Sequence, residues 1–166
     1  MLTKTDFTSD EWNVVRRAPF TAGLVVVAAS PSGPIGVVKE MFAVSKTLAD
    51  VKLHGASSGL VKAVVADLET AEGRQSVPTE LEAKSPDQLR SAALDACRQA
   101  AAIVETKGEP DEAQAFKGWL VSIGQEVAEA AKEGGFLGFG GTRVSEQETS
   151  ALKALSAALG ERPEAR

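Results

Sequence analysis

Apolar residues recur at alternating spacings of three and four along much of this chain, which is the spacing of one face of an α-helix. The pattern is longest in three stretches and shorter in four others. The three long stretches are 37–51, 89–103 and 116–130, and the shorter ones are 9–17, 20–29, 60–69 and 146–159. The sequence therefore predicts about seven helices.

Residues that favour helix ends flank these stretches. The first amides of a helix have no partner within it, so a side-chain oxygen placed just before them is stabilising. Thr8, Ser85 and Ser145 have this position, and each is followed three residues later by Glu or Gln, which is the capping-box pattern. Proline favours the first helical turn and glycine favours the residue after a helix. We therefore expect Pro19 to begin a new helix and Gly160 to end the last one.

The Val-rich segment 24–28 is the best candidate for a β-strand. It is short and has no partner strand, and its place in the chain also suits a buried helix, so we interpret it as helical. The predicted fold is all-α, a single bundle of about seven helices over residues 1–166. Its two halves, about 1–68 and 86–160, are joined by a polar segment at 69–85.

One sequence pattern occurs twice. Residues 28–36 and 130–138 both contain Ala-Ala, three residues, a glycine, two residues and a second glycine. A helix with an early acidic residue follows each copy, with Glu40 in the first and Glu146 or Glu148 in the second. A chance match in an Ala- and Gly-rich chain is one explanation. A true duplication predicts two pseudo-symmetric helix-loop-helix halves.

The second copy also carries a resemblance to a known family. A helix ending in small residues, a glycine turn, the run at 144–148 and a last helix with Leu152, Leu155 and Leu159 are similar to the hairpin of TerB-like tellurite-resistance domains. The resemblance covers about residues 125–160. It implies an all-helical bundle with internal pseudo-symmetry and a role in a stress response. The acidic Asp-Gly turn of that family is replaced here by residues 134–141, which contain no carboxylate, so no metal role is carried over.

The glycine-rich segment 134–141 supports three interpretations. Its free amides, together with the start of the last helix, can hold an anion, and the first glycine turn can do the same. The candidate ligand-binding residues are Gly33, Gly36, Gly134, Gly135, Gly138, Gly140, Gly141 and Arg143. Alternatively, the large apolar residues of the segment fill the space between helices, or Phe136 and Phe139 dock a protein partner.

Composition excludes several classes of function. With 18 basic and 23 acidic side chains the net charge is −5, which disfavours a nucleic-acid partner. The longest apolar stretch, 22–29, is too short for a membrane-spanning helix, which needs roughly 20 residues. One cysteine and one histidine exclude an internal disulfide and a multi-histidine metal site. We expect a cytoplasmic chain with no cofactor, no metal, no nucleic-acid partner and no membrane.

Other candidate residues have simple structural explanations. Cys97 lies among alanines of a helical stripe, which predicts a buried and unreactive thiol, and His54 precedes a glycine at a helix end. Trp12 and Trp119 fit the core. Three glutamates at helical spacing, Glu126, Glu129 and Glu133, fit a solvated acidic face better than a cation site.

These patterns show no convergent set of acid, base and nucleophile, so we assign no catalytic residue. The leading hypothesis is a non-enzymatic cytoplasmic interaction module that acts through a protein partner or as a homo-oligomer. The first alternative is a small-ligand or anion-binding protein that uses the glycine-rich loops. The second is a small enzyme centred on Cys97.

Overall fold

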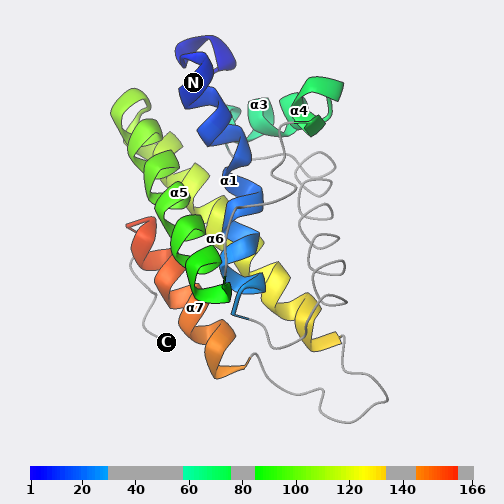
Figure 1. The fold of residues 1–166 in the computed structure, drawn as a ribbon. Coiled ribbons are helices and arrows are strands. Elements are labelled where there is room, and N and C mark those ends of the chain that lie inside the picture. The colour runs from blue at the N-terminus through cyan, green and yellow to red at the C-terminus, as the bar shows by residue number, and fades with distance from the viewer. Residues whose placement is uncertain (30–57, 76–84, 134–144, 161–166) are drawn as a thin grey trace.

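The computed structural model describes residues 1–29, 58–75, 85–133 and 145–160 (Figure 1). These residues form α-helices and one short 3-10 turn, and no strand occurs among them. The elements are η1 (Lys4–Asp6), α1 (Ser9–Val27), α3 (Gly59–Leu68), α4 (Ala71–Gln75), α5 (Pro86–Lys107), α6 (Pro110–Glu133) and α7 (Glu146–Ala158). The predicted all-α fold is confirmed for this part of the chain.

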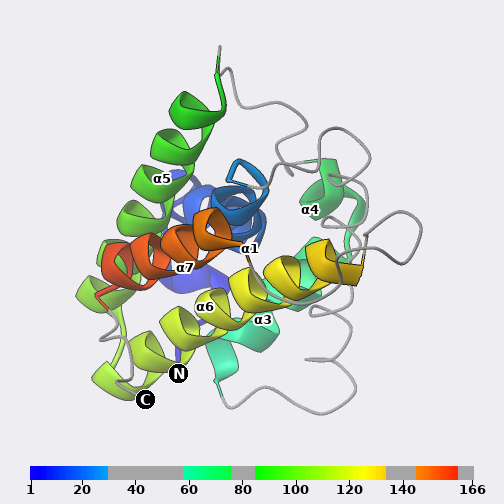
Figure 2. The ribbon, with the colours of Figure 1, turned by 90° about the horizontal axis from the view of Figure 1, so that it is seen from below.

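Helix α1 lies at the centre of the molecule. Helices α5 and α6 pack along it, and α7 contacts all three near one end (Figures 1 and 2). The turn η1 and helices α3 and α4 lie at the opposite end (Figure 1). Apolar side chains of the longer helices form one shared core. Its largest fully buried members include Phe116, Leu60, Leu120, Ile123 and Leu155.

Helix α1 is continuous from Ser9 to Val27, with Pro19 inside it. The prediction of two separate helices at 9–17 and 20–29 was therefore wrong. An internal proline removes one backbone hydrogen bond and costs about 3 kcal/mol in an isolated helix. Here Pro19 and its neighbours are buried and α1 packs against both α5 and α6, so tertiary packing of the helix offsets that cost. The helical interpretation of segment 24–28 is confirmed up to Val27.

The predicted helix ends are confirmed where the structure describes them. Thr8 and Ser145 form complete capping boxes with the glutamates three residues later, and the Ser85 hydroxyl accepts from the amide of Gln88 at 3.2 Å. Gly160 follows α7 with a φ of 70°, the left-handed conformation in which glycine is favoured.

The polar segment 69–85 contains a helix that the sequence did not predict. Helix α4 has no apolar stripe, so helical periodicity gives no signal for it. Its position depends on Gly73, because a Cβ there would lie 1.9 Å from the carbonyl oxygen of Asp67. The amide of Gly73 donates to the hydroxyl of Thr70 at 2.9 Å. Close backbone contact therefore places α4 beside the end of α3.

Several predictions fall on residues that the structure does not describe. The expected helix at 37–51 lies in the gap from 30 to 57. Most of both copies of the repeated pattern, at 28–36 and 130–138, also lies in such gaps. The pseudo-symmetry of the two halves therefore stays a prediction.

The sequence also predicted that the chain has no membrane-spanning helix. None of the helices in the described ranges combines the length and apolar character needed to cross a membrane.

Two glycines of α6 form a matched pair for testing the packing. A Cβ at exposed Gly118 would meet no atom within 4 Å, whereas a Cβ at Gly124 would lie 2.7 Å from Cδ2 of Leu155 on α7. We expect Gly118→Ala to raise the free energy of unfolding by about 0.5–1 kcal/mol, because alanine loses less backbone entropy on folding. We expect Gly124→Ala to lower it by about 1–2 kcal/mol, because the buried Leu155 side chain, or α7 with it, must move away from α6. Urea unfolding followed by circular dichroism measures both changes, and equal effects of the two substitutions would contradict the close contact of α6 with α7.

Candidate functional site

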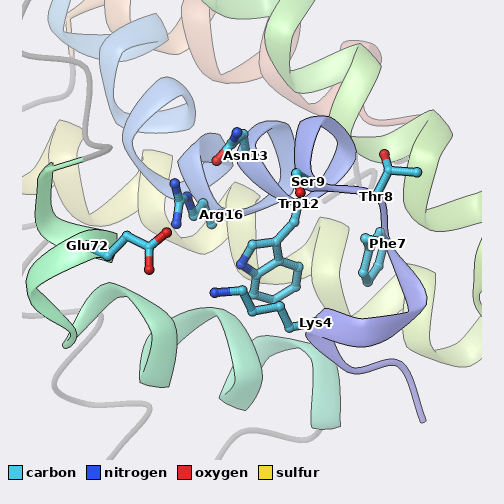
Figure 3. Close-up of a pocket in the computed structure, with 8 residues that line it drawn as sticks. All are labelled: Lys4, Phe7, Thr8, Ser9, Trp12, Asn13, Arg16 and Glu72. Carbon is cyan, nitrogen blue, oxygen red and sulfur yellow. The ribbon is translucent and has the colours of Figure 1, made fainter.

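A pocket of about 240 Å³ lies between η1, α1 and α4 (Figure 3). Its wall is mostly polar and carries two cationic side chains, one carboxylate, two hydroxyl groups and one amide, beside two aromatic rings. The lining residues are Lys4, Phe7, Thr8, Ser9, Trp12, Asn13, Arg16 and Glu72. The rings of Phe7 and Trp12 are only 9% and 2% exposed, so polar groups supply most of the accessible wall.

Asp67, near the end of α3, joins the parts of the chain that form this pocket. One of its carboxylate oxygens accepts from Lys4 Nζ at 2.8 Å. The other accepts from Trp12 Nε1 at 2.9 Å and from an Nη of Arg16 at 3.2 Å. A single carboxylate thereby connects η1, α1 and α3, and it fixes two residues of α1 that line the pocket.

These contacts determine the ionisation of Asp67. Burial alone raises the pKa of the carboxyl, because it disfavours the charged form. Hydrogen bonds from Lys4, Trp12 and Arg16 outweigh this effect and hold the pKa of Asp67 below its ordinary value of 3.8. The carboxylate is therefore charged at neutral pH and balances one of the two cations beside it.

The N-terminal segment, which contains Leu2 and η1, makes further contacts with α6 and α5. The carboxylate of Glu112 on α6 accepts from the amide of Leu2 at 2.8 Å and from the amide of Leu60 at 3.2 Å. Glu112 therefore connects the segment to the first turn of α3, whose N-cap residue Ser58 makes no side-chain cap. On α5, Lys107 donates to the carbonyl of Asp6 at 3.0 Å. These contacts hold η1, which forms one wall of the pocket, in place.

Arg16 is the most unusual residue of the pocket. It is 7% exposed, and its Nε finds no hydrogen-bond partner in the described part of the chain. Only its bond to Asp67 satisfies the guanidinium there. A buried donor without a partner costs about 1–3 kcal/mol, so this arrangement is expected to serve a purpose.

The site residues predicted from sequence lie outside the described ranges. Each candidate of the two glycine turns falls in the gap 30–57 or the gap 134–144. They are Gly33, Gly36, Gly134, Gly135, Gly138, Gly140, Gly141 and Arg143, together with the proposed partner contacts Phe136 and Phe139. His54 also lies outside the described residues. Their roles stay predictions.

Cys97 is buried in the core, as its alanine-rich surroundings indicated. Burial raises the pKa of its thiol to about 11, although a weak hydrogen bond with the hydroxyl of Thr21, at 3.6 Å, acts in the opposite direction. At neutral pH the sulfur is protonated. It is a poor nucleophile, because the thiolate is the reactive form.

The other sequence candidates behave as structural residues. Trp12 and Trp119 are buried, as predicted, and Glu129 is exposed on α6. In the described ranges, no three His, Cys, Asp or Glu side chains gather in a way that could hold a metal ion.

The pocket was missed by the sequence analysis, although one signal for it exists. Arg16 follows Val15 and lies four residues after Trp12, which places it on the buried side of α1. A charged residue on an apolar face requires a partner or a function.

The contacts of Asp67 predict how stability depends on pH. Its folded-state pKa is depressed, so its contribution is fully present above 3.8 and is lost as pH falls through the lower folded value. We expect Asp67→Asn to cost about 3 kcal/mol at pH 7, because Arg16 and Lys4 lose their shared counter-charge. The difference between wild type and Asp67→Asn should shrink as pH falls below 3.8, as urea titrations at a series of pH values can measure. A difference independent of pH would show that the carboxylate charge contributes nothing.

Comparisons of the chain with protein-family models, with curated proteins and with solved structures give no match. The resemblance of residues 125–160 to TerB-like domains therefore stays a prediction from sequence. The residues that line the pocket are therefore the basis of the proposed function.

Proposed function

We propose that this chain is a non-enzymatic helical binding protein, whose pocket between η1, α1 and α4 takes the anionic group of a small polar ligand. The observation that supports this most directly is the buried guanidinium of Arg16, whose Nε is unpaired in the described part of the chain. A carboxylate or phosphate oxygen is the acceptor that best matches a guanidinium. Nε itself is enclosed by protein, so a ligand oxygen would meet the guanidinium at the part that lines the pocket.

The cations in contact with Asp67 support an anion. Lys4 and Arg16 carry two positive charges, and the carboxylate of Asp67, which both contact, balances one of them. Glu72, the carboxylate of the pocket wall, forms no ion pair with either cation in the described residues. Because Arg16 and Asp67 are about nine-tenths buried, their electrostatic interactions are screened less than those of surface groups. We therefore propose the pocket, instead of the glycine turns, as the anion site.

The enzyme hypothesis receives less support. It depended on Cys97 as a nucleophile, and that thiol is buried with a raised pKa of about 11. In the described residues, no hydrogen bond joins the hydroxyl of Ser9 to Lys4 or Glu72, the groups of the pocket wall that could act as its base. We therefore propose binding rather than catalysis.

Arg16→Lys tests the anion proposal. Lysine keeps the positive charge beside Asp67, which preserves the fold, but one ammonium cannot supply the two-sided geometry of the guanidinium. We expect butyrate to bind the wild-type chain by isothermal titration calorimetry, and we expect Arg16→Lys to weaken its binding at least about tenfold, equivalent to about 1.4 kcal/mol.

The matched control is Arg98→Lys. Arg98 is exposed on α5, where it pairs with Asp95 and does not line the pocket, so its substitution should leave the affinity unchanged. Circular dichroism verifies that both variants remain folded. If the two variants bind butyrate equally well, or if the wild type binds neither butyrate nor 4-aminobutyrate, the pocket is not an anion site.

Association through the glycine-rich segment is the second candidate function, and it is favoured by the combination of Phe136 and Phe139 with flanking glycines in the sequence. We expect light scattering to give wild type a mass above the 17.3 kDa of one chain. The double substitution of both phenylalanines by serine should return the mass to that of a monomer. A monomeric wild type would rule out self-association.

A further inference from the structure

The pocket also carries a negative charge that a simple anion does not explain. Glu72 of α4 lines the pocket and is exposed, and its carboxylate extends toward the side of α1 that bears Arg16 (Figure 3). The described residues form no ion pair between Glu72 and Arg16. Two cations that are held by Asp67, Lys4 and Arg16, and the carboxylate of Glu72, which pairs with neither in the described residues, therefore line one small pocket.

A ligand with only negative charge fits this arrangement poorly. It would gain the attraction of Arg16 but would also meet the repulsion of Glu72 within the same pocket. A ligand with only positive charge would be attracted by Glu72 but repelled by Arg16, and it would leave Nε of Arg16 unpaired. Both charged groups are used only when the ligand carries both signs.

The remaining wall and the size of the pocket suit a small polar molecule. The hydroxyl of Ser9 and the amide of Asn13 line it and offer both donors and acceptors. A volume of about 240 Å³ corresponds to the space of about eight water molecules at ~30 Å³ each. A molecule of similar size with two charged ends can lie between α1 and α4.

We infer that the ligand is a small zwitterion, a free amino acid or a short amino-terminated carboxylic acid. Its carboxylate accepts from Arg16, and its ammonium pairs with Glu72. This inference rests on the proposed function, because it assigns the anionic group to the same guanidinium. It adds a role for α4, the helix that Gly73 holds against the end of α3.

Calorimetry with matched ligands tests the inference. The probes are the ω-amino acids from glycine to 6-aminohexanoate, the unsubstituted carboxylates from acetate to hexanoate, and butylamine, in Tris chloride buffer at low salt. We expect at least one amino acid to bind about tenfold more tightly than the carboxylate of the same chain length, and we expect butylamine not to bind. The chain length with the largest preference reports the separation of the two charged groups.

Glu72→Gln is the decisive variant. Glu72 is exposed, so the substitution should not affect folding, and it should abolish the preference for the amino acid while leaving carboxylate binding intact or stronger. Glu129→Gln, an exposed glutamate of α6 outside the pocket, should change neither.

The outcomes separate the inference from the proposal on which it rests. Equal affinities for amino acids and carboxylates in wild type, or a preference that persists in Glu72→Gln, would overturn the zwitterion inference and leave the anion proposal standing. Binding of neither ligand class would overturn both.

Discussion

The carboxylate of Asp67 is the interaction on which the candidate site depends. It accepts hydrogen bonds from Lys4, Trp12 and Arg16, and so it connects the N-terminal turn, the central helix and α3. Because Asp67 lies 51, 55 and 63 residues from these donors, the pocket exists only when the end of the bundle is assembled. Because Arg16 has only this shared carboxylate as a partner, its Nε–H makes no hydrogen bond in the described residues. This unpaired donor makes the pocket a candidate binding site.

Much of the fold could be predicted from sequence, because the physics of an amphipathic helix is local. The spacing of apolar residues predicted α3, α5, α6 and α7, and the cap residues Ser85 and Ser145 indicated where α5 and α7 begin. The continuity of α1 was not predicted, because a proline by its local effect ends a helix. Packing of α1 against α5 and α6 outweighs this local effect of Pro19. Helix α4 was missed because it is short and polar and depends on a tertiary contact at Gly73.

The site was harder to predict, because its parts are joined by contacts distant in sequence. Asp67 lies 51 residues from Arg16 and 63 from Lys4, and no spacing rule connects them. The sequence instead suggested a ligand site at the two glycine turns, because their composition is locally unusual. A single arginine on the buried side of α1 is a weaker pattern, but its physical meaning is more specific, because a buried charge needs a counter-charge and a full set of acceptors.

Nuclear magnetic resonance of the Arg16 side chain tests the central claim most directly. In the ¹⁵N-labelled full chain, the Nε–H signal that disappears in Arg16→Lys identifies the group. If a ligand carboxylate pairs with the guanidinium, addition of a binding amino acid should shift this signal and slow its exchange with water, because the group then takes part in a charge-assisted hydrogen bond. A signal that keeps its shift and its exchange rate as the ligand is added would contradict the account.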